Sequence, residues 1–211
     1  MGFWGCEAVV VTHGSLNGGR RSPLRKLILV KHSLPQIVPA LPSDRWLLSE
    51  EGRRRAGLLA ERIRPLRPGV VVSSREPKAR ETADVIAGSA GLTVVVREGL
   101  HEHERSGVGF LGALEFDEAI RSMFARPAEL VLGDETAVEA GRRFASAVEA
   151  VLDRYRDGDV VVVAHGTVIA LFVSGANDVA PFQFWSKLGL PSYVVLSAPG
   201  MGLLETVGSI E

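Results

Sequence analysis

The sequence is poor in several features that would mark a secreted or membrane-bound protein. Its 211 residues include a single cysteine, Cys6, which cannot form an internal disulfide and is typical of a reducing compartment. No apolar run approaches the roughly 20 residues that span a bilayer. The first residues lack the basic segment and long apolar stretch of a secretory signal. These absences predict a cytoplasmic protein that has no membrane partner.

An excess of charge of one sign is also absent. The chain has 24 basic and 25 acidic side chains and a net charge of −1, so no overall field attracts nucleic acid or an acidic membrane. We therefore expect no nucleic-acid partner, although the net charge leaves a local basic pocket open. Hydrophobic residues make up 46% of the chain and charged residues 23%, which is typical of one globular domain with a substantial core.

The first 25 residues differ from the rest of the chain. They contain a short apolar piece, AVVVTHGS, and then a stretch rich in glycine and arginine, which predicts a flexible extension ahead of a folded domain at residues 26–211. His13 lies in the apolar piece and imitates two later histidines. We interpret His13 as a chance match, because short motifs recur without function.

Strand and helix signals alternate from Lys26 onward. Short apolar runs bounded by polar residues predict strands at 27–30, 70–72, 92–96 and 160–163. Amphipathic patterns with capping residues predict helices from Ser49 to Pro65, from Pro77 to Gly88, over 135–155 and from about 167. This order predicts an α/β fold, with a mostly parallel sheet and helices on both faces. Reactive groups in such sheets gather beyond the carboxyl ends of the strands.

Histidines end two of the predicted strands. LILVKHS places His32 after one strand, and VVVVAHG places His165 after another. One histidine at a strand end is usually structural, but two on neighbouring strands indicate a functional site. Nearby, SSREPKARETA at 73–83 begins a helix whose free backbone N–H groups attract anions, and Lys78 adds a positive charge there. Together these residues predict a phosphate site.

Five short motifs follow one another along the chain: Lys31-His32-Ser33, Leu48-Ser49-Glu50-Glu51-Gly52, Ser73–Ala83, Leu100-His101-Glu102 and His165-Gly166. In order and spacing they resemble the motifs of the histidine phosphatase superfamily, also called phosphoglycerate mutase-like. The resemblance runs from about Lys26 to Leu196. It implies a three-layer α/β/α sandwich and chemistry through a phosphohistidine.

The resemblance implies a role for each of these polar residues. His32 would attack phosphorus through a neutral ring nitrogen, while Glu102 would give the leaving group a proton and later take one from water. For the first of these steps, the pKa of Glu102 would have to be raised. Because cations must neutralise the phosphoryl group before attack, it would be held by Lys31, Lys78, His165 and Ser33. No cofactor and no metal ion is required.

Lysine stands at two positions where the family usually has arginine, Lys31 and Lys78. Lysine keeps the charge but lacks the planar, two-pronged donor, so the exchange alters how the anion is held. The exchange leaves open the alternative that the protein binds a phosphorylated ligand without turnover. Arg75 and Arg80 flank Lys78 and are further candidates to reach inward, but Arg80 is a weak one because it lies about 200° around the helix from Lys78. Val38 stands where many members have a phosphate-contacting asparagine.

Other motifs in the sequence fail on their context. HEHE at 101–104 suggests a metal site, but in a strand its histidines would face one side and its glutamates the other. GVGFLG at 107–112 matches a dinucleotide-binding pattern, yet it follows polar residues rather than a buried strand. The chain has no G-x-x-x-x-G-K-S/T loop and no G-x-S-x-G elbow. We therefore expect no metal ion and no nucleotide cofactor.

The segment 106–134 is rich in apolar residues and has no cluster of basic ones. In the family such an insertion sits over the pocket and helps to select the substrate, so this composition argues against a second phosphate site and against a phosphoglycerate mutase. Phe182, Phe184 and Trp185 fit core packing best, with a pocket wall or a homodimer patch as alternatives. We predict a phosphatase that acts on a small phosphorylated metabolite. A phospho-ligand-binding protein and a mutase-type phosphotransferase are the alternatives.

Overall fold

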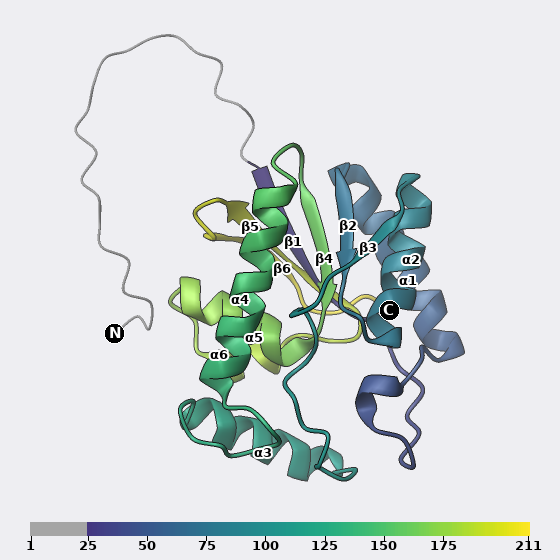
Figure 1. Cartoon of the computed structure of the whole chain (residues 1–211). Helices are drawn as coiled ribbons and strands as arrows, with labels where there is room; N and C mark the ends of the chain where they lie inside the picture. Colours follow the sequence, from purple (N-terminus) through teal and green to yellow (C-terminus); the bar gives the residue numbers. More distant parts are fainter. Residues whose placement is uncertain (1–24) are drawn as a thin grey trace, which may run out of the picture.

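Figure 1 shows the computed structural model of the chain, which describes residues 25–211. His13 and nearly all of the predicted extension lie outside the described residues. Arg25, which the sequence assigned to that extension, is the first residue of strand β1 (Arg25–Lys31). Its guanidinium donates hydrogen bonds to the carbonyls of Leu152 and Gly158. Arg25 therefore belongs to the folded region, contrary to the predicted boundary.

A six-stranded sheet forms the centre of the molecule, with its strands in the order β3-β2-β4-β1-β5-β6. β2 (Val70–Ser73), β3 (Val94–Val96) and β4 (Val160–Ala164) join β1 in a parallel arrangement, as predicted. β5 (Ser192–Ala198) pairs antiparallel with both β1 and β6 (Leu203–Val207). Neither β5 nor β6 was predicted from the sequence.

Helices cover both faces of the sheet, which makes three layers (Figure 1). One face carries α1 (Glu50–Ile63) and α2 (Pro77–Ala90), and the other carries α4 (Ala137–Arg154) and α5 (Gly166–Ala176). The expected α/β/α sandwich is thereby confirmed. No helix within residues 25–211 has the length and apolar character needed to cross a membrane. The shorter elements are α6 (Pro181–Trp185) and two 3₁₀ turns, Ser43–Arg45 and Arg64–Leu66.

Alternate side chains of the central strands enter two separate cores. Ile28 and Val30 of β1 pack with α1 and α2, whereas Leu27 and Leu29 pack with α4 and α5. All four side chains are fully buried, since successive residues of a strand point to opposite faces. This explains why the strand is a continuous apolar run rather than an alternation of apolar and polar residues.

A serine sets where α1 begins and a glycine sets where α2 ends. The Ser49 hydroxyl accepts the Gly52 N–H at 2.9 Å, so Ser49 caps α1 as predicted. The predicted end of α2 at Gly88 is wrong, because the helix continues to Ala90 and is followed by Gly91. Gly91 has a φ of 68°, the left-handed conformation that often terminates a helix.

The segment 106–134 forms helix α3 (Ala113–Ala125) between two loops. Figure 1 shows α3 beyond the carboxyl-terminal ends of the parallel strands, at the same end of the molecule as the loop that follows β1. Ile120, Met123 and Phe124 anchor α3 in the core shared with α4 and α5. The segment therefore lies at the end of the sheet where the sequence predicts the functional site.

Candidate active site

Two adjacent strands bring the two histidines to one point. β1 and β4 are parallel neighbours in which Lys31 pairs with Ala164, so His32 and His165 follow at the same level. The His32 N–H continues the pairing by donating to the Ala164 carbonyl at 3.1 Å. The two imidazole rings lie 5.2 Å apart, centroid to centroid, at an angle of 61°. The structure thus brings together the two residues on which the predicted site chiefly depends.

The His32 ring is oriented by the backbone of the next residue. Its Nδ1 lies 2.7 Å from the Ser33 carbonyl oxygen, so Nδ1 carries the hydrogen that is donated and Nε2 keeps a lone pair. Burial, then the neighbouring His165 and the charge of Lys78, hold the pKa of His32 well below its usual value. The ring is therefore neutral near pH 7 and has a nitrogen that can attack an electrophile.

His165 is completely buried. Its Nε2 lies 2.9 Å from the Ser74 hydroxyl and 3.3 Å from a carboxylate oxygen of Glu76. Its Nδ1 has no hydrogen-bond partner among the described residues. Burial and then the charge of Lys78 lower the pKa of His165 well below its usual value. A buried polar atom without a partner costs stability, but His165 is not among the residues that line the cavity and this nitrogen is shielded from it.

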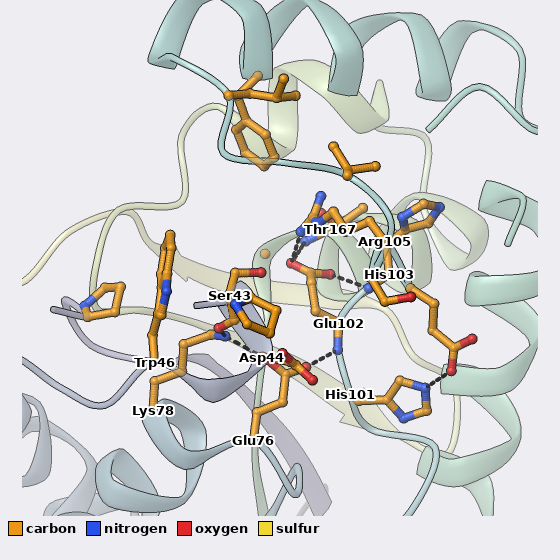
Figure 2. Close-up of a pocket in the computed structure, with 18 of the residues that line it drawn as sticks. Ser43, Asp44, Trp46, Glu76, Lys78, His101, Glu102, His103, Arg105 and Thr167 are labelled. Carbon is orange, nitrogen blue, oxygen red and sulfur yellow. Dashed lines mark hydrogen bonds and ion pairs between the residues drawn. The ribbon is translucent and has the colours of Figure 1, made fainter. Parts of the chain in front are cut away.

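Lys78 points inward from the first turn of α2. Its side chain is almost fully buried, and its ammonium donates to the Ser43 carbonyl and to a Glu76 carboxylate oxygen, both at 2.6 Å (Figure 2). An ammonium group has three hydrogens, so one remains for a ligand. Arg80, the weaker candidate on the same helix, is exposed and pairs with Asp84.

Lys31 reaches the same cavity from the end of β1. Its ammonium donates to the Leu188 carbonyl at 2.6 Å, and its chain passes close to Gly166, where an added Cβ would lie 3.1 Å from Lys31 Cε. Burial lowers the pKa of Lys31 to about 8, although the charge of Glu102 opposes the shift. The ammonium is therefore mostly protonated at neutral pH and loses its charge in mildly alkaline solution.

Glu102 lies at the N-terminus of α5. Its carboxylate accepts the backbone N–H groups of Thr167 and Val168 at 3.2 and 3.3 Å and lies 3.5 Å from the Arg105 guanidinium (Figure 2). Burial raises the pKa of Glu102, but Arg105, His165 and a backbone hydrogen bond outweigh burial, so the net shift is downward. Burial alone therefore does not give the raised pKa that proton donation requires, and in the protein without substrate Glu102 is a carboxylate.

Glu76 is a buried carboxylate within the site that was not predicted from the sequence. One of its oxygens accepts the Glu102 N–H at 2.8 Å and the other pairs with Lys78 (Figure 2). The first oxygen also lies 3.3 Å from His165 Nε2. Glu76 lies in the SSREPKARETA motif, directly before α2, where nothing distinguishes an inward carboxylate from one on a solvated first turn. Glu76 thus contacts three predicted site residues, Glu102, His165 and Lys78, and neutralises the charge of Lys78.

Arg105 is a second residue that the sequence analysis missed. Its guanidinium pairs with Glu102 and lies 5.0 Å from the centre of the Phe116 ring. Its Nη1 is buried and has no hydrogen-bond partner within residues 25–211. Arg105 therefore brings a third positive group to the cavity, and one of its N–H groups is free. Its position three residues after Glu102 was the one signal in the sequence.

One prediction about the site is wrong, and the HEHE stretch differs from the strand in which it was considered. Ser33 is fully buried and its hydroxyl donates to the Gly52 carbonyl at 2.7 Å, so the side chain is not available to a phosphate oxygen. The HEHE stretch is a loop rather than a strand; its first histidine bonds to Glu104 and its second to a backbone carbonyl. The described residues contain no group of three or more side chains placed to hold a metal ion.

Comparison with known proteins shows the family. The model of the histidine phosphatase superfamily (branch 1) matches residues 43–200, which is well over half of the chain. The chain belongs to the histidine phosphatase superfamily. The resemblance found in the sequence motifs is thereby confirmed, although the matched region begins after Lys31-His32-Ser33.

Individual relatives of this superfamily member are distant. A probable phosphoglycerate mutase of Yersinia pestis is 27% identical over 154 residues, which make up 69% of this chain and 65% of the relative. The chain thus spans slightly less than two thirds of the length of that relative. A solved mycobacterial glucosyl-3-phosphoglycerate phosphatase is 25% identical, with a TM-score of 0.67 over 82% of this chain and 90% of that one. A solved phosphoserine phosphatase from Entamoeba histolytica is 19% identical, with a TM-score of 0.71 over 87% of this chain and 97% of that one, and supports the fold alone.

Proposed function

We propose that this chain is a phosphatase that hydrolyses a small phosphomonoester through a phosphohistidine at His32. One observation carries the proposal: the rings of His32 and His165 meet at the ends of adjacent strands, and Lys31 and Lys78 line the same cavity as His32. A phosphomonoester is an anion that repels nucleophiles, so nearby cations have to neutralise it. Lys31, Lys78 and Arg105 each have hydrogens left for this purpose.

In the first step, the lone pair of His32 Nε2 attacks phosphorus, and the bond from phosphorus to the alcohol oxygen breaks. The Ser33 carbonyl keeps its hydrogen bond to Nδ1 and stabilises the positive charge that forms on the ring. The departing oxygen takes a proton from Glu102, which has to be protonated at that moment. The negative phosphoryl group beside Glu102 raises the pKa of that carboxyl and so opposes Arg105.

In the second step, water attacks the phosphohistidine. Glu102, now a carboxylate, takes a proton from the water as its oxygen bonds to phosphorus. The bond from phosphorus to nitrogen breaks and its electron pair returns to Nε2. Inorganic phosphate leaves and neutral His32 is restored. Glu102 returns its proton to solvent in the free protein and takes one up again when the next substrate binds.

The proposal is tested by the turnover of p-nitrophenyl phosphate together with chemical trapping. His32→Ala is expected to lower kcat/KM by about 1000-fold or more. Wild-type protein quenched during turnover is expected to carry phosphate that is stable in alkali and lost in acid, which marks a phosphohistidine. Equal turnover by the wild type and His32→Ala would overturn the proposal.

Two substitutions on α2 compare the inward-pointing charge of Lys78 with the exposed charge of Arg80. Lys78→Ala is expected to lower kcat/KM by about 100-fold, because it removes a cation that meets the phosphoryl group. Arg80→Ala is the matched control, since Arg80 is exposed and pairs with Asp84 on the outer side of the same helix. Its kcat/KM is expected to equal that of the wild type.

A protein that binds a phosphorylated ligand without turnover is the second candidate function. It is favoured by the lowered pKa of Glu102, which leaves this carboxylate without a proton to give to a leaving group. Calorimetry with inorganic phosphate, run beside the turnover assay, separates the two functions. Binding of phosphate without any release of p-nitrophenol would favour the second candidate.

A further inference from the structure

The cavity that contains His32 continues well beyond the residues of the proposed reaction. Its volume is about 660 Å³, within the range of pockets that enclose drug-sized ligands. A phosphoryl group fills a small part of such a space. The remainder contains an apolar subsite, which we define by four aromatic side chains that line it: Trp46, Phe110, Phe116 and Trp185.

Separate segments of the chain hold these rings in place. Trp46 lies in the loop after β1, where its indole N–H donates to the carbonyls of Val38 and Leu41, both at 3.1 Å. Phe116 of α3 packs against Trp185 near the end of α6, with 6.0 Å between the ring centres. Trp46, Phe116 and Trp185 are therefore held in place before a ligand arrives, which lowers the entropy lost on binding.

The apolar subsite adjoins the groups that would bind the phosphoryl group. Lys78 donates to the Ser43 carbonyl, which also accepts the backbone N–H of Trp46 at 3.3 Å. Lys31 and Trp185 both approach Gly166, where an added Cβ would lie 3.3 Å from Lys31 Nζ and 3.3 Å from Trp185 Nε1. The rest of a substrate held at the two lysines would therefore extend between these aromatic rings.

The charges that line the cavity disfavour a second anionic group. Four basic and five acidic side chains line it. Lys31 is the one basic side chain of the described lining that has no carboxylate partner, and it lies at the phosphoryl end. A carboxylate or second phosphate on the substrate would therefore meet more negative than positive charge. The other basic side chains pair with acids: Lys78 with Glu76 at 2.6 Å, Arg105 with Glu102 at 3.5 Å and Arg75 with Glu98 at 3.0 Å.

We propose that the substrate is the phosphomonoester of a bulky, uncharged alcohol, whose aromatic or equivalent apolar group occupies the apolar subsite. This inference rests on the proposed phosphatase function. It separates the chain from the relatives named for phosphoserine and for glucosyl-3-phosphoglycerate, since both of those compounds carry a carboxylate. Phe110, which is 56% exposed, would be covered by such a group.

Three alkyl phosphates with the same reacting end test the inference: propyl, 3-phenylpropyl and 3-carboxypropyl phosphate. Their leaving groups are closely similar, so kcat/KM from phosphate release compares the tails alone. The phenylpropyl ester is expected to exceed the propyl ester by about 10- to 100-fold, as for burial of a phenyl ring, and the carboxypropyl ester to fall below it. Equal values would overturn the inference. A preference for the carboxypropyl ester would also overturn it and would assign the free N–H of Arg105 to a carboxylate.

Substitutions test whether the apolar subsite causes the preference for the phenylpropyl ester. In each variant, kcat/KM for this ester is divided by kcat/KM for propyl phosphate. Trp46→Ala and Phe116→Ala are each expected to lower the phenylpropyl-to-propyl ratio by about fivefold or more. Leu114→Ala is the matched control, because Leu114 lies on α3, is 86% exposed and does not line the cavity. The ratio is expected to be unchanged in this control. An unchanged ratio in both aromatic variants would contradict the inference.

Failure of the proposed function can be distinguished from failure of this inference. If no phosphate is released from any ester, the phosphatase function is overturned, and binding then tests the apolar subsite directly. Calorimetry with 3-phenylpropylphosphonate and propylphosphonate, which cannot be hydrolysed, is expected to show the same 10- to 100-fold preference, on the order given by burial of the ring. Equal affinities for the two phosphonates would overturn the inference.

Discussion

Lys31 and Lys78 hold the positive charge of the site in different ways. Lys78 pairs with the carboxylate of Glu76, so its charge is largely neutralised within the protein. Lys31 meets only a backbone carbonyl, and its pKa is about 8. In the sequence the two positions are alike, since each is a lysine where arginine is usual. Their surroundings make one a paired charge and the other a charge that titrates near neutrality.

Anion binding is therefore expected to weaken in alkaline solution. Lys31 is charged below its pKa of about 8 and neutral above it, so kcat/KM for p-nitrophenyl phosphate should fall at higher pH, by up to about tenfold per pH unit. In Lys31→Arg this fall should move to about pH 10 or above, because a guanidinium stays charged. Profiles of kcat/KM against pH for both proteins check this. The same alkaline fall in both would contradict the assignment to Lys31.

Glu76 is expected to limit the affinity of the site for anions. Glu76→Gln removes the negative charge beside Lys78 and His165, so the inhibition constant of inorganic phosphate should decrease by about fivefold. The same substitution replaces an acceptor oxygen by a donor and should lower the free energy of unfolding by about 1–3 kcal/mol. Phosphate inhibition and urea denaturation measure the two effects separately. Weaker phosphate binding in Glu76→Gln would show that Glu76 serves to orient Lys78 rather than to neutralise it.

At the next scale, the start of α1 supports the loop that carries His32. Gly52 lies against this loop so closely that an added Cβ would overlap the Leu34 carbonyl oxygen. The Gly52 carbonyl also accepts the Ser33 hydroxyl at 2.7 Å. Glycine is required here by the close approach of two backbones. The last position of the Leu-Ser-x-x-Gly motif is thereby explained by packing rather than by contact with a ligand.

Gly52→Ala is expected to damage both stability and activity. The overlap with Leu34 should lower the free energy of unfolding by about 2 kcal/mol or more, and displacement of the loop should lower kcat/KM. Gly57→Ala on the same helix is the matched control, because no atom lies within 4 Å of its added Cβ. It should raise the free energy of unfolding by about 0.5–1 kcal/mol. Urea denaturation of both variants, with turnover assays, checks the contrast; equal effects would refute the packing argument.

For the whole molecule, the charge of Lys31 favours binding of an anion but destabilises the folded state. Burial makes its charged form unfavourable, and this destabilisation is fully present below pH 8 and is relieved as the pH rises from about 8 toward 10.5. Lys31→Met should therefore raise the free energy of unfolding at pH 7, on the order of 2 kcal/mol, while it weakens phosphate binding. Denaturation and calorimetry at pH 7 measure the two effects. A less stable Lys31→Met variant would contradict the sign.

The parallel part of the fold is readable from the sequence because strands buried on both faces are continuous apolar runs. Leu27–Val30 and Val160–Val163 are fully buried in this way. Helix ends are less certain, as α2 shows by passing Gly88 and ending before Gly91. β6 is an exposed edge strand without such a run. β5 has one at Tyr193–Leu196, but its antiparallel direction depends on pairing with β1 and β6, which is a tertiary contact.

The sequence by itself determined the sandwich and the meeting of His32 and His165, because strand direction and register bring the residues after two paired parallel strands to the same level. Only the tertiary structure decided the charges around them. Glu76 turns inward to neutralise Lys78, Arg105 reaches Glu102 from the edge of the insertion, and Ser33 bonds to α1 instead of facing the cavity. The physical reason is that electrostatic interactions act between groups that are distant in sequence, so their partners are known only after folding.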